Sequence, residues 1–395
     1  MAAALLPVAE AQQRLFARAA PLAEEEVPIA LAAGRWAARD ILARRTQPAS
    51  ALSAMDGYAI RFADLPGPWE VIGESAAGRG FAGAVALGQA VRIFTGAPLP
   101  PGADTILVQE EAAREGDHLA LAGEGPLRLG GNVRARGLDF VEGDVLLRAG
   151  ARITPAALAL AALAGHATLP VRRKVRVALL STGDELVAPG VPLEPDQIPE
   201  TNRLLLAAML ADLPVELIDL GILPDRLDVL EAAFRALDCD LLVTTGGASV
   251  GDHDLVRPAL LAAGAEIDFW KIALRPGKPM MAGRLGDAML LGLPGNPVSV
   301  FATATLFVRP LVAHLAGAAD PLPRSHMVPL GEPLPANGPR ADYLRAELVG
   351  GSAFAATIQD SSMLRTLARA TCLIVRPAGA PEAKTGDSAE ILDIA

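Results

Sequence analysis

The chain has 395 residues, so three or four domains are expected, because single hydrophobic cores rarely grow past about 250 residues. A net charge of −10 and an aromatic content of only 4% disfavour nucleic-acid binding, which uses basic surfaces interleaved with aromatic side chains. Residues 299–317 are interrupted by Arg309 and Pro310 and residues 1–15 lack a secretory signal, so we expect a cytoplasmic protein that crosses no membrane.

The N-terminal part of the chain predicts a helical or extended domain followed by a β-rich one. A helix is expected over residues 8–20, and a helical or irregular stretch then ends near residue 45. From residue 46 to residue 144, glycine and proline recur every few residues between short runs of β-forming residues. This texture indicates a separate β-rich domain.

A second helix returns the chain to its first domain. Thr154 suits a helix N-cap, Pro155 suits the first helical position, and Gly165 suits the end of the helix. Residues 145–173 are therefore expected to complete the helical or extended domain begun by residues 1–45, with the β-rich domain inserted between them.

Residues 174–319 alternate between strand and helix patterns, which predicts a doubly wound, mainly parallel α/β domain. The expected strands are 175–180, 215–220, 240–244, 280–282 and 289–291, and the expected helices are 201–210, 227–236 and 298–316. In such sheets, ligands bind beyond the carboxyl ends of the strands. Residues 320–395 again read as short strands and turns, which predicts a small C-terminal β-barrel.

The glycine-rich loop at residues 244–254 is the strongest local signal, because it directly follows the apolar run 241–243. The residues of this loop that are expected to bind the ligand are Gly246, Gly247, Ser249 and Gly251. Glycines let the backbone approach a phosphate closely, and carboxylates are hard ligands for Mg²⁺. The loop predicts a phosphorylated ligand with Mg²⁺, and either Asp252 or Asp254 faces the cation.

Four further polar clusters lie in turns, and each has an ordinary structural alternative. They are residues 53–59 with Asp56, residues 95–98 with Thr95, residues 181–185 with Thr182, Gly183 and Asp184, and a cationic stretch with Lys271, Arg275, Pro276 and Lys278 followed by the turn Pro294–Pro297. The first two clusters also suit plain turns. Cations beside a helix N-terminus can hold an oxyanion or a pyrophosphate, whereas prolines that only cap a helix need no ligand. Cys239 and Cys372 lack the spacing of a disulfide framework or a zinc site.

In chain order, these motifs resemble those of the molybdopterin molybdenumtransferases, the MoeA and gephyrin E-domain family, over essentially the whole chain. The motifs that carry the resemblance are Ser-Ala-Met-Asp-Gly-Tyr-Ala (53–59), Thr-Gly-Ala-Pro (95–98), Arg-Gly-Leu-Asp (136–139), Ser-Thr-Gly-Asp-Glu-Leu (181–186), Thr-Gly-Gly-Ala-Ser-Val-Gly (245–251), Pro-Gly-Lys-Pro (276–279) and Leu-Pro-Gly-Asn-Pro (293–297). The resemblance implies an elongated, four-domain homodimer. Its α/β domain binds adenylylated molybdopterin, and the β-rich domain completes the site across the dimer.

Such enzymes insert molybdate into the dithiolene of the pterin, use Mg²⁺ and release AMP. Carried over by resemblance, the catalytic residues are Asp56, Thr95, Asp139, Glu185, Asp225 and Asp254. Of these, Asp56, Glu185 and Asp254 are the expected Mg²⁺ ligands. Lys271 and Lys278 match the cationic stretch of the family, and Arg275, Arg340 and Ser361 are expected to join them in holding molybdate. Arg275 stands where many members carry lysine, which leaves its role open.

Two other functions compete with insertion. The chain is alternatively a pterin-nucleotide carrier or scaffold without turnover, or a molybdopterin adenylyltransferase. Expected partners are a molybdopterin adenylyltransferase that delivers the intermediate and apo-molybdoenzymes that receive the cofactor. Molybdate and tungstate are similar dianions, so the sequence leaves the physiological oxyanion open.

Overall fold

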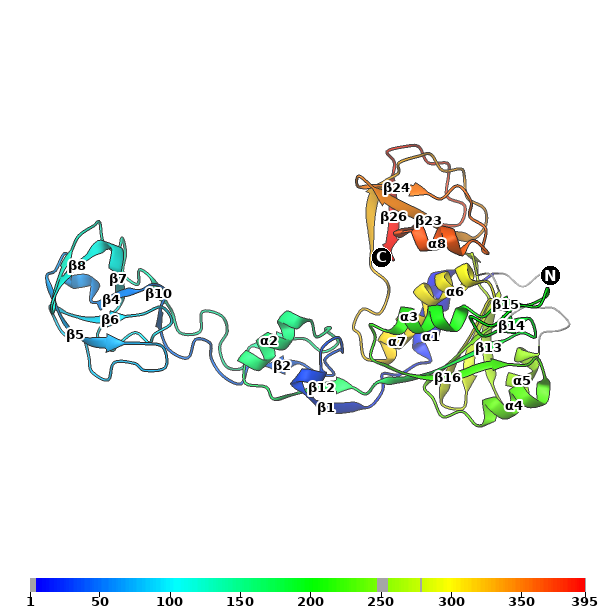
Figure 1. Cartoon of the computed structure of the whole chain (residues 1–395), viewed down its shortest axis with the longest axis horizontal. Helices are drawn as coiled ribbons and strands as arrows, with labels where there is room; N and C mark the ends of the chain where they lie inside the picture. Colours follow the sequence, from blue (N-terminus) through cyan, green and yellow to red (C-terminus); the bar gives the residue numbers. More distant parts are fainter. Residues whose placement is uncertain (1–4, 247–254, 278, 395) are drawn as a thin grey trace.

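The computed structural model describes residues 5–246, 255–277 and 279–394. The molecule is elongated, with a β-rich domain at one end and an α/β domain and a C-terminal β domain at the other (Figure 1). A narrow middle region joins the two ends. Two segments far apart in the sequence run side by side there, so both chain connections to the β-rich domain pass through this region.

The middle region is built from short antiparallel pairs. Strand β1 (Glu24–Pro28) pairs with β12 (Thr168–Arg172), and β2 (Ile41–Leu42) pairs with β11 (Val145–Leu147). The helix expected after Thr154 is confirmed as α2 (Pro155–Leu163), and the Thr154 hydroxyl accepts a hydrogen bond of 3.2 Å from the Ala157 amide. The stretch before residue 45 forms strands and a 3-10 turn (Ile29–Leu31) rather than an α-helix, so the helical alternative is wrong.

The first helix, α1 (Val8–Ala17), packs on the α/β domain although its sequence position lies in the first domain. Ala11 and Leu15 are fully buried in the same hydrophobic core as the central sheet. The Gln12 side chain donates a 2.8 Å hydrogen bond to the Leu306 carbonyl. Pro310 has no amide to bond that carbonyl four residues before it, so Gln12 supplies the missing donor.

The β-rich domain contains a six-stranded sheet in the order β7-β4-β6-β5-β9-β8. Its strands are β4 (Gly57–Ile60), β5 (Trp69–Ser75), β6 (Gln89–Ile93), β7 (Thr105–Val108), β8 (Ala112–Glu115) and β9 (His118–Leu121), and the short pair β3 (Leu52–Ser53) and β10 (Val133–Arg134) stands beside them. Apolar clusters cover both faces, one around Trp69 and one around Ile93. The expectation of short strands between turns is confirmed.

The α/β domain has the sheet order β16-β13-β17-β21-β20-β18. Its strands are β13 (Val175–Thr182), β16 (Val215–Leu223), β17 (Leu241–Thr245), β18 (Glu266–Lys271), β20 (Pro279–Leu285) and β21 (Ala288–Leu293). The pairings among β16, β13, β17 and β21 are parallel, whereas β20 is antiparallel to both of its neighbours. The mainly parallel sheet predicted from the alternating pattern is therefore observed.

Helices cover both faces of this sheet. Helices α3 (Asn202–Leu210), α6 (Pro297–Thr303) and α7 (Arg309–Leu315) share one core with α1, and α4 (Leu227–Arg235) and α5 (Val256–Ala262) share the other. In β13, Val177 and Leu179 point into the first core, while Ala178 and Leu180 point into the second. Burial on both faces explains why this strand is continuously apolar.

The run Pro297–Leu315 is one helical stretch in which five residues, Ala304–Val308, form a π-helical turn between α6 and α7. By length and composition it is the one stretch among the described residues that could cross a membrane, but 83% of its most apolar window is buried inside the protein. It is accordingly a core helix of the α/β domain, and the Arg309–Pro310 pair lies within it rather than ending it.

The C-terminal domain forms a curled sheet in the order β19-β23-β25-β26-β22, with β24 also paired to β23. Its elements are β22 (Ser325–Pro329), β23 (Ala341–Val349), β24 (Ser352–Ala355), α8 (Leu364–Arg369), β25 (Cys372–Arg376) and β26 (Ser388–Asp393). A bridge between Leu330 and Ala353 brings the far edge of the sheet to β24 in a barrel-like closure. Strand β19 (Leu274–Arg275) comes from the α/β domain and pairs with β23.

Candidate active site

Three loops meet at the carboxyl edge of the central sheet, because the strands that precede them are neighbours. In the parallel register, Ser181 of β13 stands beside Thr245 of β17, and Thr245 stands beside Leu293 of β21. The loops that follow these strands start at Gly183, Gly246 and Pro294. This is the edge at which doubly wound sheets bind ligands.

Glycine permits the close approach of these loops. Gly246 has a φ of +86°, and a Cβ atom there would lie 2.4 Å from the Thr182 carbonyl oxygen. A Cβ atom at Gly295 would lie 3.8 Å from the Gly246 Cα, in ordinary contact. The backbones of all three loops therefore come together at Gly246, and a side chain there would force them apart.

Acidic and hydroxyl groups gather on the first loop. The Thr182 hydroxyl donates to Asp225 Oδ1, and the Asp225 amide donates to Asp184 Oδ1 over 3.2 Å. The Glu185 carboxylate folds over Gly183, since its Oε2 would lie 2.7 Å from a Cβ atom at that glycine. The structure thus brings together five of the predicted residues around the end of β13.

The second predicted acidic site lies in the β-rich domain. Asp56 Oδ1 accepts hydrogen bonds from the Thr95 amide (2.7 Å) and the Thr95 hydroxyl (2.8 Å). These two bonds, the amide bond first, lower the pKa of Asp56 below its ordinary value, and the charge of nearby Arg92 adds to the effect. The Arg92 guanidinium stacks on the rings of Tyr58 and Phe94, at 5.1 and 4.8 Å from their centroids.

Asp139 lies at the start of the middle region, where its amide donates to the Gln47 carbonyl over 3.1 Å and its side chain is exposed. Within one chain, the β-rich domain, which carries Asp56 before β4 and Thr95 after β6, lies at the opposite end of the molecule from the α/β domain (Figure 1). A single chain therefore does not bring these residues to Glu185 and Asp225.

The cationic stretch contacts the C-terminal domain. Arg275, in β19, forms an ion pair with Asp342 of β23, whose side chain is buried. Pro276 follows it, and Lys271 is exposed at the end of β18. The charge of Arg275 is therefore compensated by a carboxylate of the neighbouring domain.

Ser361 reaches the third loop from the C-terminal domain. Its hydroxyl accepts a 3.0 Å hydrogen bond from Asn296 Nδ2, and Asn296 is the N-cap residue of α6, with Pro297 at the first helical position. The buried guanidinium of Arg345 holds the loop before Ser361 by donating to the Asp360 and Ile358 carbonyls. Arg340 lies just before β23, and its carbonyl accepts a bond from Asn337.

Several predicted site residues lie outside the residues that the structure describes. They are Gly247, Ser249, Gly251, Asp252, Asp254 and Lys278. Among the described residues, no group of three or more histidine, cysteine, aspartate or glutamate side chains is close enough to hold a metal ion. The Mg²⁺ ligand set Asp56, Glu185 and Asp254 stays a prediction, because one member is not described and another lies in the β-rich domain.

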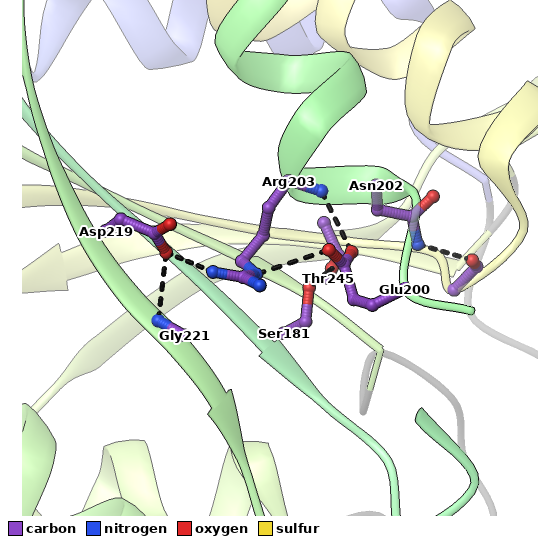
Figure 2. A network of polar contacts seen from close by, with 8 residues as sticks. Ser181, Glu200, Asn202, Arg203, Asp219, Gly221 and Thr245 are labelled. Carbon is purple, nitrogen blue, oxygen red and sulfur yellow. Dashed lines mark hydrogen bonds and ion pairs between the residues drawn. The ribbon is translucent and has the colours of Figure 1, made fainter. Parts of the chain in front are cut away.

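A polar network that the sequence analysis missed stands directly behind the first two loops (Figure 2). It consists of Ser181, Glu200, Asn202, Arg203, Asp219, Gly221 and Thr245. The one signal for it was the tetrapeptide Pro-Glu-Thr-Asn at residues 199–202, just before a helix. From the sequence, this segment predicts only the start of the helix expected over residues 201–210, and it does not single out Glu200.

Comparison with known proteins agrees with this architecture. Family models described as the MoeA N-terminal region (domain I and II), a probable molybdopterin binding domain and the MoeA C-terminal region (domain IV) match residues 6–165, 178–314 and 327–394. A molybdopterin molybdenumtransferase of Haemophilus influenzae is 42% identical over 301 residues, which cover 75% of this chain and 74% of the relative.

Two longer matches span almost the whole chain. Molybdopterin molybdenumtransferase 2 of Mycobacterium tuberculosis is 33% identical over 384 residues, which cover 93% of this chain and 94% of the relative. The crystal structure of a molybdopterin biosynthesis MoeA protein from Pyrococcus horikoshii superposes with a TM-score of 0.85 at 28% identity, covering 99% of this chain and 100% of that one. The resemblance inferred from the motifs is confirmed, and the chain belongs to the MoeA family of molybdopterin molybdenumtransferases, enzymes of molybdenum cofactor biosynthesis.

Proposed function

We propose that this chain inserts molybdate into adenylylated molybdopterin in a Mg²⁺-dependent reaction that releases AMP. The observation that carries the proposal is the meeting of three loops at Gly246, with the carboxylates of Asp184, Glu185 and Asp225 beside them. Glycine-rich backbone and a hydroxyl suit a pyrophosphate, and the acidic groups suit the cation that an anionic ligand brings to a protein of net charge −10.

The oxygen donors at the end of β13 fit Mg²⁺. They are the hard carboxylate oxygens that this ion prefers, and Asp225 and Asp184 are already linked to each other through the Asp225 amide. Glu185 would hold the ion together with the predicted ligands Asp254 and Asp56, the latter from a second copy of the chain, and with phosphate oxygens of the ligand. When bound, Mg²⁺ would neutralise charge on the pyrophosphate and on the departing AMP.

The residues of the chain have separate tasks in this reaction. Gly246 lets the backbone lie against the phosphates, and Thr182 keeps the Asp225 carboxylate at the site. Overall, the elements of one water are added across the P–O–P bond, so that molybdopterin keeps one phosphate and AMP leaves. Molybdate exchanges one oxo ligand for the two dithiolene sulfurs, and that oxygen leaves as water with the two thiol protons.

Molybdate is a dianion, and cations and hydrogen-bond donors near the third loop suit it. The sequence offers Lys271, Lys278, Arg340 and Ser361 as candidates, and of the described ones Ser361 is hydrogen-bonded to Asn296 of the third loop. Arg275 is the weakest candidate in this group, because Asp342 already compensates its charge. We assign Arg275 to the connection between domains, where it fixes the position of the cationic stretch.

The Asp56–Thr95 pair would reach the site from a second copy of the chain. Support for this comes from its position at the far end of an elongated molecule, where it cannot join the loops of its own α/β domain (Figure 1). We therefore propose a homodimer in which the β-rich domain of one protomer completes the site of the other. Closed two-fold dimers of this kind form two equivalent sites.

The test is incubation of purified protein with adenylylated molybdopterin and Mg²⁺, with molybdate or tungstate present or absent. AMP release and the activation of an added apo-molybdoenzyme are measured together. Oxyanion-dependent AMP release with activation supports insertion, and the more effective oxyanion identifies the preferred metal. We expect the reaction in the cytoplasm, with a molybdopterin adenylyltransferase as supplier.

Three alternative results would each contradict insertion. Tight nucleotide binding without AMP release indicates a carrier or scaffold. Consumption of ATP with metal-free molybdopterin indicates an adenylyltransferase, and no nucleotide binding at all excludes every function proposed for the site. Omission of Mg²⁺ should abolish AMP release, and its restoration should recover it.

A further inference from the structure

Glu200 is a buried carboxylate directly behind the proposed nucleotide site. Its side chain is 1% exposed, and it follows the short strand β15 (Ile198–Pro199), which pairs with β14 (Leu186–Val187). The Glu200 amide donates to the Val187 carbonyl over 2.8 Å, and the Ile198 amide donates to the Glu185 carbonyl over 2.9 Å. The backbone before Glu200 is thereby fixed to the loop that carries Glu185.

The carboxylate links the ends of two strands to the start of a helix (Figure 2). Glu200 Oε1 accepts hydrogen bonds from the Ser181 hydroxyl (3.0 Å) and the Arg203 amide (2.9 Å), and the Ser181 and Thr245 hydroxyls are 2.7 Å apart. An ionised carboxylate can only accept, so Ser181 donates to Glu200 and Thr245 donates to Ser181. Both hydroxyls are fully buried, and they stand within two residues of Gly183 and Gly246, where the ligand loops begin.

The charge of Glu200 is compensated from the side away from the loops. Arg203 Nε lies 3.3 Å from Glu200 Oε2, and the other end of the same guanidinium donates to Asp219 on β16. Asp219 also accepts a 2.9 Å bond from the Gly221 amide. Buried ion pairs seldom add net stability over apolar side chains of similar volume, so stability alone does not explain an ion pair in this position.

The next turn of chain holds the third loop. Asn202 lies two residues after Glu200. Its Nδ2 donates a 2.7 Å hydrogen bond to the Gly295 carbonyl. The start of α3 therefore bonds to the ends of β13 and β17 through Glu200 and to the Pro294–Pro297 loop through Asn202. Three loops that come from three different strands share this single anchor.

We propose that Glu200 is a positioning residue, which holds the backbone of residues 182–187 and of Gly246 in the arrangement that binds the pterin nucleotide. This inference rests on the proposed function for the identity of the ligand. A loop that is already ordered loses less entropy on binding, so the effect of Glu200 appears as affinity. Arg203 and Asp219 act one step further away by keeping the carboxylate in place.

The test compares Glu200→Gln with the control Glu231→Gln. Glu231 also pairs with an arginine in the same domain, Arg235, but on the helix α4 away from the loops. The Glu200 variant should raise KM for adenylylated molybdopterin about tenfold, because a neutral amide oxygen accepts the Ser181 and Arg203 bonds more weakly than the carboxylate and forms no ion pair with Arg203. It should change kcat less than about threefold. The control should leave both constants at the wild-type values. All assays are run well below the unfolding temperature of each variant.

Hydrogen exchange gives a readout that is independent of the reaction. In the ligand-free protein, amides of residues 182–187 and Gly246 should exchange about tenfold faster in Glu200→Gln than in the wild type, while amides of the β-rich domain keep their rates. Ser181→Ala cuts only the link to the loops and leaves the Glu200–Arg203 pair intact. It should reproduce the changes at about a third of their size, and it serves if Glu200→Gln does not fold.

The outcomes separate this inference from the proposed function. Unchanged loop exchange and unchanged KM in both Glu200→Gln and Ser181→Ala overturn it, even if thermal stability falls. Equal changes in the Glu231 control also overturn it. If the wild type fails to bind adenylylated molybdopterin but loop exchange still depends on Glu200, the proposed ligand is wrong and the positioning role is supported.

Discussion

The two acidic sites of this molecule are built in opposite ways. In the β-rich domain, Asp56 is held by one residue, Thr95, through two short bonds at the surface. At the edge of the α/β sheet, Thr182, Gly246 and Gly295 come from three strands and depend on a buried network behind them. The first site is formed by two residues of one domain, whereas the second depends on contacts among three loops and the buried network. Because the two acidic sites lie in different domains, each can be altered without changing the other.

The largest expected effect comes from removing one carboxylate in either acidic site. Asp56→Asn and Glu185→Gln should each abolish AMP release while nucleotide affinity stays within about threefold, because the amides keep the shape and lose the charge. The measurement is AMP release beside equilibrium binding. Full activity in either variant would show that the residue has been assigned to the wrong site.

Mixing the two inactive variants tests whether Asp56 and Glu185 of one active site come from different protomers. If the halves come from different protomers, random exchange gives about half mixed dimers with one intact site each, and about a quarter of wild-type activity returns. Unfolded and refolded mixtures are assayed against each variant alone. No recovery, despite confirmed mixed dimers, would place both halves of the site within one chain.

The next effect tests the contacts among the three loops. Gly246→Ala puts a Cβ atom against the Thr182 carbonyl at a φ of +86°, and should weaken nucleotide binding about 100-fold while lowering stability by about 1–3 kcal/mol. Calorimetric titration and thermal unfolding measure the two. Gly88→Ala is the matched control, since it also has a positive φ but nothing within 4 Å. It should lose stability without losing affinity.

A smaller effect tests the local pair. Thr95→Val removes the hydroxyl bond but keeps the amide bond, so the pKa of Asp56 should rise part of the way towards 3.8. Because the folded pKa is depressed, the contribution of the pair is present above the unfolded pKa and is lost as pH falls through the folded one. The acid limb of activity should move upward in pH. Carboxyl NMR titration of both proteins measures the shift, and an unchanged pKa would contradict the assigned cause.

The smallest effect concerns the thiol of Cys239, which lies in neither site. Burial raises the pKa of Cys239 to about 11, with Asp240 adding to the shift, so the thiol stays protonated at pH 8. A disulfide reagent should label it far more slowly than a free cysteine, until the pH approaches its pKa. Cys239→Ser should leave AMP release unchanged, and a loss of activity would connect this part of the sheet to the site.

The sequence was most informative where a single segment decides its own structure. The alternating pattern predicted the strand over residues 175–180 in a mainly parallel sheet, and Thr154 with Pro155 predicted the start of α2. The short turns and strands of the β-rich domain were predicted for the same reason. Motif order identified the family, which composition alone could not do.

Contacts between distant segments could not be read in the same way. Glu200 could not be singled out from the sequence, because Ser181 lies 19 residues away from it and Thr245, which bonds to Ser181, lies 64 residues beyond Ser181. The place of α1 against the α/β core depends on Leu306 and a proline nearly 300 residues later. Charge compensation of Arg275 by Asp342 also escaped prediction, since a cation in a motif gives no sign of its partner.

Strand β19 makes the C-terminal domain structurally dependent on the α/β domain. Leu274 and Arg275 lie in register with Ala341 and Asp342, so residues of the α/β domain form one edge of the C-terminal sheet. Residues 320–395 therefore cannot be exchanged between relatives without affecting this strand pairing. The new C-terminal domain must offer a strand edge that pairs with β19 and a carboxylate that pairs with Arg275. Otherwise the backbone groups of β19 lose their partners and the Arg275 guanidinium has no counter-charge at the domain boundary.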